Sequence, residues 1–266
     1  MRVPTPNGGS SKGRWGDLMP RIISALVMVS VALLAIWAGG LVFTLVIALC
    51  CGGMVWELSQ MLAPRRSGIA LQLGFTTAAA VFFAGVLPIW LGLALLLVPV
   101  VQGWLQVSQP AKTRFAVFAL LIVLAGYSFI WMRVSLGADW LIWLAVVVVA
   151  TDVAGYFAGK TFGGPKFWPR ISPKKTWSGT SAGWVAAALV GAVAGSLFDM
   201  GVGLVLASVL ISMASQAGDV AESALKRQTG VKDSSGLIPG HGGLLDRFDG
   251  MLGAAAMFLL LYSFLG

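Results

Sequence analysis

Apolar residues run along this chain in long blocks, and short polar connections separate the blocks. A helix needs about 20 apolar residues to cross the roughly 30 Å hydrocarbon core of a bilayer. Blocks of that length recur from Ile22 to the end of the chain, with no soluble-type block between them. The pattern predicts nine transmembrane helices, at about 21–38, 41–62, 69–87, 88–107, 115–133, 139–158, 179–197, 201–225 and 250–265.

Glycine and proline divide blocks that would otherwise be continuous, because these residues interrupt regular structure. The predicted breaks lie at Gly39-Gly40, Pro88, Gly137 and Gly201. The expected fold is therefore an all-α, polytopic integral membrane protein. Composition supports this class: 58% of the residues are hydrophobic and 11% are charged, whereas about a quarter of a soluble domain is charged.

The first 20 residues are polar and rich in Gly, Ser and Pro, and we expect them to form a cytosolic tail. The apolar stretch that follows has no small-residue cleavage pattern, so we interpret it as a retained first helix and not as a signal peptide. Residues 21–266 are then a single membrane domain. The two cysteines, Cys50 and Cys51, are adjacent in an apolar run, which favours packing over a disulfide or a metal pair.

Lysine and arginine predict the orientation, because they accumulate in cytoplasmic connections. With a cytoplasmic N-terminus, every Lys and Arg except Arg133 falls on the cytoplasmic side of the nine predicted helices. An odd number of helices then leaves the C-terminus outside.

Small residues recur every four positions along the predicted helix 179–197, and stripes of this kind let helices approach closely in lipid. The members are Gly179, Gly183, Ala187, Gly191 and Gly195. Gly155, Gly159 and Gly163 extend the same spacing at the end of the helix before it. Both runs predict tight helix packing.

Four acidic residues lie inside predicted helices, where a charge is costly and usually functional. They are Glu57, Asp152, Asp219 and Glu222, all toward the cytoplasmic ends. For Glu57 the simplest interpretation is an ion pair with the loop cations and no further role. Asp152 and Asp219 precede the two most polar loops, so we expect them to be functional.

The first of these loops, residues 159–179, holds five cations and no acid. It ends in Ser172, Lys174, Lys175 and Thr176, where the next helix begins. The N-terminus of a helix offers free N–H groups and a positive dipole end, which suit phosphate. A basic patch that grips anionic lipid headgroups is the alternative, and the two are compatible.

The second loop, residues 231–250, holds three carboxylates, two cations, five glycines and the only histidine. Asp246 and Asp249 lie one helical turn apart, and with Asp219 they could form an oxygen-rich site of the kind that binds Mg²⁺ together with phosphate. The glycines would let the backbone approach a nucleotide closely. No Walker A motif is present. His241 lacks partners for a zinc site; it serves either in the reaction or as a structural hydrogen bond.

The stretch "SALKRQTGVKDSSGLIPGHGGLLDRFD", residues 223–249, resembles the signature of the phosphatidate cytidylyltransferases, also called CDP-diacylglycerol synthases. The matching positions are Ser223, Lys226, Arg227, Lys232, Asp233, His241, Gly242, Gly243, Asp246, Arg247 and Asp249. "TDVAGYFAG" (151–159), "SPKKT" (172–176) and "GDVAES" (218–223) resemble further blocks of the family. One position departs: Ser178 stands where the family usually has Glu.

The resemblance implies that the chain joins CTP to phosphatidic acid, forming CDP-diacylglycerol and pyrophosphate. It also implies Mg²⁺, with a second metal ion left open, and a homodimer. The distribution of Lys and Arg, together with a lipid substrate in the bilayer and CTP in the cytosol, predicts a bacterial inner-membrane protein whose active site, within about 139–250, faces the cytoplasm. Asp219, Asp246 and Asp249 would hold the metal, and Lys226, Arg227, Lys232 and Arg247 would neutralise phosphates. His241 is a further catalytic candidate. The substrate-contact candidates are Asp152, Ser172, Lys174, Lys175, Thr176, Glu222, Ser223, Asp233, Gly242 and Gly243.

The chemistry of the substrates agrees with this interpretation. A phosphate monoester has its second pKa near 6, so phosphatidate is already an anionic nucleophile and needs no general base. The net charge of +8 suits anionic lipid and nucleotide substrates, and no nucleic-acid partner is expected. Two alternatives remain. One is another CTP-dependent lipid transferase or kinase, acting on an ether lipid phosphate or a polyprenol. The other is an ion-coupled transporter, which would carry its acids nearer the bilayer midplane.

Overall fold

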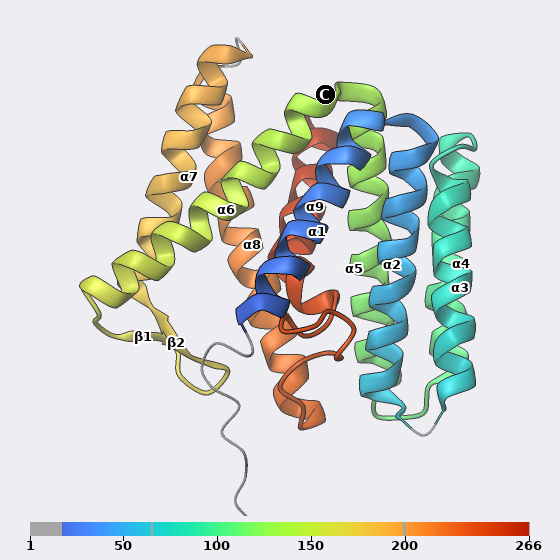
Figure 1. Ribbon diagram of the computed structural model, residues 1–266. Coiled ribbons are helices and arrows are strands. Elements are labelled where there is room, and N and C mark those ends of the chain that lie inside the picture. The colour runs from blue at the N-terminus through green and yellow to red at the C-terminus, as the bar shows by residue number, and fades with distance from the viewer. Residues whose placement is uncertain (1–17, 65, 199–200, 266) are drawn as a thin grey trace, which may run out of the picture.

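The computed structural model describes residues 18–64, 66–198 and 201–265, which form long helices and one short hairpin (Figure 1). The first helices are α1 (Leu18–Ala38), α2 (Gly40–Leu62), α3 (Ser67–Ala84), α4 (Ile89–Gln106) and α5 (Lys112–Trp131), which continues into a π-helical turn, η1 (Met132–Leu136). The later elements are α6 (Ala138–Thr161), β1 (Lys166–Trp168), β2 (Ser172–Thr176), α7 (Trp177–Leu197), α8 (Gly201–Thr229) and α9 (Leu245–Leu265).

The all-α membrane class is confirmed, and each predicted helix has a counterpart among the described residues. Within the described part of the chain, eight helices, α1 to α8, are long and apolar enough to cross a membrane. α9 is not among the eight, and three charged residues, Asp246, Arg247 and Asp249, lie within its first five positions. The cytoplasmic N-terminus stays a prediction, and most of the expected tail (1–17) falls outside the described residues.

Two details of the connections differ from expectation. The second polar loop is shorter than predicted, because α8 continues to Thr229 and α9 begins at Leu245 rather than near Gly250. The first polar loop contains an antiparallel hairpin in which Lys166 pairs with Thr176 and Trp168 with Ser172. Strands this short show no alternating pattern, and their basic residues are not typical of strands. The sequence therefore does not predict them.

The helices form two groups that α9 joins. On one side α2, α3, α4 and α5 pack together, and on the other α6, α7 and α8 do, while α9 contacts both α5 and α8 (Figure 1). Fully buried Leu58, Phe115, Ile122 and Leu252 belong to the apolar core that α2, α5 and α9 share. Because α9 starts directly after the second polar loop, that loop is held where the two groups meet.

The predicted small-residue stripe on α7 is confirmed as a packing face, since all five of its members are buried. A Cβ atom on Gly179 would stand 2.6 Å from the carbonyl oxygen of Gly155 on α6, and one on Gly191 would stand 2.8 Å from the carbonyl oxygen of Leu204 on α8. Gly163 does not belong to the packing. It follows the end of α6 with φ +61°, and no heavy atom lies within 4 Å of its Cβ position.

Candidate active site

Asp246, in the first turn of α9, is the most heavily bonded carboxylate of the signature stretch. Its Oδ2 atom accepts hydrogen bonds from the backbone N–H groups of Ser234 and Gly243, both at 2.8 Å, and from the hydroxyl of Ser234 at 2.9 Å. Its Oδ1 atom accepts one from the Lys226 ammonium at 2.6 Å. The side chain therefore closes the second polar loop onto the start of α9 and onto α8.

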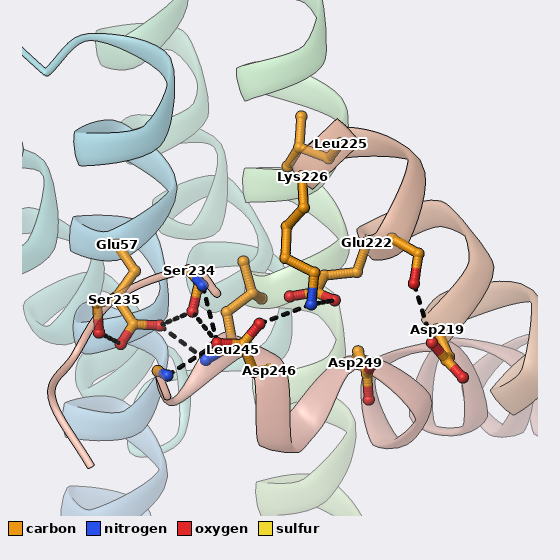
Figure 2. A network of polar contacts seen from close by, with 12 residues as sticks. Glu57, Asp219, Glu222, Leu225, Lys226, Ser234, Ser235, Leu245, Asp246 and Asp249 are labelled. Atoms are coloured by element: carbon orange, nitrogen blue, oxygen red, sulfur yellow. Dashed lines mark hydrogen bonds and ion pairs between the residues drawn. The ribbon is translucent and has the colours of Figure 1, made fainter. Parts of the chain in front are cut away.

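Glu57 on α2 is a second carboxylate that holds the same loop, and it comes from the group of helices formed by α2 to α5 (Figure 2). Oε1 accepts from the Ser235 hydroxyl at 2.6 Å and from the backbone N–H of Leu244 at 2.8 Å. Oε2 accepts from the backbone N–H of Leu245 at 2.7 Å and lies 3.1 Å from the Ser234 hydroxyl oxygen, whose single proton it shares with Asp246. A carboxylate at free N–H groups of a helix N-terminus also complements the helix dipole.

The expectation that Glu57 pairs with loop cations is wrong. The residue is 0% exposed and takes part in no ion pair among the described residues. Its partners are hydroxyl and backbone donors, which leave its charge buried but fully hydrogen-bonded. Glu57 is thus a positioning residue that fixes where the second polar loop ends and α9 begins.

Position 243, at this junction, has no room for a side chain, so glycine is required there. A Cβ atom there would come within 1.9 Å of the Ser234 hydroxyl oxygen and 2.7 Å of Glu57 Oε1. The neighbouring Gly242 has φ +85°, a backbone conformation that other residues rarely adopt. Gly243 was expected to contact substrate; it is buried in the loop anchor, the contacts of Asp246 and Glu57 with the second polar loop, and it lines neither of the cavities described below.

Lys226 lies between two acids, as Figure 2 shows. Its ammonium is 2.5 Å from Glu222 Oε2, four residues earlier on α8, and 2.6 Å from Asp246 Oδ1. Glu222 is 1% exposed, so this ion-paired group is largely shielded from water. Both Lys226 and Glu222 therefore contribute to holding α8 against the start of α9.

The first five residues of α9 precede the apolar part of that helix, and their two carboxyl groups, Asp246 and Asp249, lie in different electrostatic surroundings. Burial would raise the pKa of Asp246, but the Lys226 ammonium and the backbone N–H groups of Gly243 and Ser234 lower it to about 2. Burial raises the pKa of Asp249 to about 7, and the nearby negative charge of Asp219 adds to the rise. Asp246 is thus a stabilised anion, whereas the raised pKa of Asp249 means that a nearby cation would favour its ionised form.

A second group of acids lies on the side of the site that faces α6 and α7. Asp219 on α8 forms an ion pair with Lys175 of β2 and accepts a 3.3 Å hydrogen bond from the Ser223 hydroxyl. Asp249 and Asp152 are both close enough to Asp219 to interact with its charge. In the view of Figure 2, Asp249 lies between Asp246 and Asp219.

The predicted metal set of Asp219, Asp246 and Asp249 is not assembled as such. Among the described residues, no group of three His, Cys, Asp or Glu side chains is arranged to hold one metal ion. Asp246 is the member that departs, because donors from the chain already occupy both of its oxygens. Asp219 and Asp249 remain neighbours whose charges repel each other, and such a pair favours a bound cation.

A cavity of about 330 Å³ opens beside this acid group, between α6, β2, α7 and α8. Asp152, Lys174, Lys175 and Thr176, four of the expected substrate contacts, line it. The Thr176 hydroxyl caps α7 by accepting a 3.2 Å hydrogen bond from the N–H of Gly179. The predicted basic segment therefore does end at a helix N-terminus.

A second cavity, of about 580 Å³, lies between the polar loop and Arg21 of α1, and it is lined by Lys232, Asp233, His241, Gly242 and Arg247. His241 Nδ1 is 2.7 Å from the hydroxyl of Ser24 on α1, a contact that holds the turn to the first helix. A hydrogen bond of this kind is what we expect if His241 has a structural role.

Some expected site residues line neither cavity. They are Ser172, Glu222, Ser223, Lys226, Arg227, Gly243 and the three predicted metal ligands. Conversely, the sequence pattern missed Lys160 and Gln216, which line the first cavity, and Arg21, which lines the second. The sequence could have pointed to Gln216, because a side-chain amide in an apolar helix, one turn before Asp219, needs a polar partner. In the structure its oxygen accepts a hydrogen bond from the Trp184 indole N–H at 3.0 Å.

Comparison with known proteins adds independent findings. The model of the cytidylyltransferase family matches residues 19–265. A phosphatidate cytidylyltransferase of Brucella suis is 39% identical over 254 residues, which cover 92% of this chain and 93% of that protein. The protein of the same name from Bacillus subtilis is 29% identical over 268 residues, covering 89% and 94%. The one from Helicobacter pylori is 46% identical over 130 residues, covering 47% and 48%.

Proposed function

This chain belongs to the cytidylyltransferase family, and we propose that it transfers the cytidylyl group of CTP to phosphatidic acid, forming CDP-diacylglycerol and pyrophosphate. It is a nucleotidyltransferase of phospholipid synthesis, as the names of its relatives support. The observation that carries the proposal is the meeting of acids and cations at one end of α6, α8 and α9. There Asp152 and Asp219 face Lys175 of β2, and Asp249 is close enough to Asp219 to interact with its charge.

A magnesium ion fits the acid group better than it fits the loop anchor. Asp219 and Asp249 would hold it, because Mg²⁺ binds through one or two carboxylates and takes its remaining ligands from phosphates and water. When bound, the ion would neutralise charge on the phosphates and orient them. Asp152, on the wall of the adjoining cavity, would help to hold the ion or would orient Lys175. Asp246 has the separate task of placing Lys226 and the loop.

The cations of the chain bring two polyanions together. Lys175 is paired with Asp219, so its ammonium is already oriented at the acid group. Lys174 lines the same cavity and takes part in no ion pair among the described residues, which leaves its charge available for phosphate. Stabilising charge as it redistributes among phosphate oxygens is the main requirement of phosphoryl-type transfer.

The proposed reaction needs no base from the protein. The phosphatidate oxygen attacks the α-phosphorus of CTP, a P–O bond to phosphatidate forms, and the bond to pyrophosphate breaks with its electrons leaving on pyrophosphate. His241 is therefore free to act as a structural residue, and its bond to Ser24 supports that role.

We place the protein in a bacterial inner membrane with the site facing the cytoplasm, where CTP is available. The sorting of Lys and Arg to one side of the predicted helices supports this placement. The exposed apolar faces of α1 and α4 are suited to lipid or to a second copy of the chain in a homodimer.

Labelled CTP tests the proposal. The purified protein, given phosphatidate vesicles and Mg²⁺, should move label from [α-³²P]CTP into lipid and release label from [γ-³²P]CTP as pyrophosphate. Transfer of the γ-label to lipid would show a kinase instead. Activity on an ether lipid phosphate but not on phosphatidate would show a different acceptor, and no CTP turnover with any lipid would refute the enzyme assignment.

A further inference from the structure

The cavity on the α1 side of the polar loop continues into an apolar groove. The groove has a volume of about 610 Å³ and lies between α1 and the tip of the loop. Its walls include Ile23 and Val27 of α1 and Leu237 of the loop. Ile238 and Pro239 line both the groove and the polar cavity, so the two spaces adjoin. Together they form one elongated site with a charged end and an apolar end.

The charged end of this site is positively charged, and its cationic side chains can bind an anion. Arg21, Lys232 and Arg247 line it against a single carboxylate, that of Asp233. None of the three cationic side chains forms an ion pair with another part of the described chain. A phosphate monoester, which carries nearly two negative charges at neutral pH, would offset the excess.

The inner wall of the charged end reaches the loop anchor. A Cβ on Gly242, which lines this cavity, would lie 2.9 Å from Asp246 Oδ2, and Arg247 follows Asp246 in the first turn of α9. A phosphate held here would therefore lie against the loop anchor.

We propose that this elongated site binds the lipid substrate, with the phosphate between Arg21, Lys232 and Arg247 and one acyl chain in the groove between α1 and Leu237–Pro239. The inference rests on the proposed function and assigns its acceptor. A nucleotide is polar along its phosphates and sugar and has no segment for an apolar groove. The first cavity, lined by Lys174 and Lys175, is then left for CTP.

α1 is the wall that makes the site. It packs loosely on the rest of the protein, with contacts to α2 and the Ser24 hydrogen bonds to His241 and to the carbonyl oxygen of Pro239, at 2.7 and 3.0 Å. An acyl chain leaves one apolar medium for another when it enters such a groove, so little hydrophobic free energy is gained. The groove sets the position of the lipid, and a bulky residue in it should act by obstruction.

Two variants on one helix test the groove. Val27→Trp should lower kcat/KM for dioleoyl phosphatidate at least about fivefold and leave the KM for CTP within twofold. The matched control is Val29→Trp, because Val29 is similarly exposed (57% against 55%) but does not line the groove. With dibutyryl phosphatidate, whose chains are too short to fill the groove, the Val27→Trp defect should disappear. Equal effects of both variants, or none, would overturn the proposal.

Arg21→Gln tests the charged end. It should raise the KM for long- and short-chain phosphatidate about fivefold, as expected for one phosphate contact at a membrane surface, with the KM for CTP unchanged. A rise in the KM for CTP alone would mean that the nucleotide occupies this cavity.

A direct labelling experiment covers the case in which the variants fail to fold. Phosphatidate with a diazirine in its acyl chain should label residues 19–28 and 237–239 of the unaltered protein more strongly than phosphatidylcholine with the same chain does. Labelling of other helices only would refute the site. Failure of the wild-type protein to make CDP-diacylglycerol would refute the proposed function instead.

Discussion

Glu57→Gln is the substitution that examines the loop anchor most directly. Glu57 accepts hydrogen bonds from two backbone N–H groups and the Ser235 hydroxyl, and it shares the proton of the Ser234 hydroxyl with Asp246. Glutamine has nearly the same shape but keeps one acceptor oxygen, and its NH₂ group must face the N–H of either Leu244 or Leu245. A hydroxyl can turn to accept a hydrogen bond, whereas a backbone N–H cannot.

The expected loss in the free energy of unfolding follows from the hydrogen bonds that the substitution weakens or removes. Hydrogen bonds to a charged group contribute about 1.5–3 kcal/mol each, and a buried donor left without a partner costs about 1–3 kcal/mol. With one such donor and two weakened bonds, the loss is about 3–5 kcal/mol, comparable to breaking a buried ion pair. For a domain of this size that corresponds to a fall in Tm of roughly 6–20 °C.

The assay combines unfolding and turnover. A thiol-reactive dye follows unfolding in detergent through the two cysteines, of which Cys51 is buried. Ser59→Ala is the matched control, because Ser59 is also buried on α2 but bonds only to the carbonyl of Val55 in its own helix. The Gln variant should lose both Tm and CTP turnover, and the control should lose less than about 1 kcal/mol. A Gln variant with Tm within 2 °C and turnover within twofold of wild type would refute the anchor.

Three further predictions follow from particular contacts. Gly243→Ala should abolish most activity and lower Tm, because its Cβ would stand 1.9 Å from the Ser234 hydroxyl oxygen; a fully active variant would contradict this. Gly179→Ala should lower Tm by forcing α6 from α7, while Gly203→Ala, whose Cβ meets nothing within 4 Å, should not; equal Tm values would count against the packing stripe. Asp249→Asn should lower Mg²⁺-dependent turnover at least about a hundredfold. Without metal, however, the same variant should be at least as stable as wild type at pH 8. The pKa of Asp249 is raised to about 7, so its ionisation disfavours the wild-type fold increasingly as the pH rises from about 4 to 7. A metal-free variant less stable than wild type at pH 8 would refute the repulsion.

The membrane architecture was readable from the sequence because bilayer thickness, glycine breaks and small-residue spacing are local constraints. Gly39, Gly137 and Gly201 have positive φ at the predicted breaks, and the stripe from Gly179 to Gly195 is buried as expected. The polar loop could be located by composition alone. The basic segment before α7 could also be placed at a helix N-terminus.

The sequence could not show which acidic residues hold the loop in place and which remain available to a cation. Spacing places Asp246 and Asp249 one turn apart, but only tertiary contacts show that Ser234, Gly243 and Lys226 occupy Asp246. Glu57 lies 177 residues before Ser234 along the chain, so no local pattern links them. The same holds for Ser24 and His241, which join α1 to the loop across 217 positions.

One measurement tests the central claim most directly: transfer of label from [α-³²P]CTP to phosphatidate by the wild-type protein and by Asp249→Asn, compared at equal folded concentration with Mg²⁺ present. The account predicts labelled CDP-diacylglycerol from the wild type and at least about a hundredfold less from the variant. Undiminished product from a correctly folded Asp249→Asn protein, or lipid labelled from the γ-phosphate instead, would contradict it.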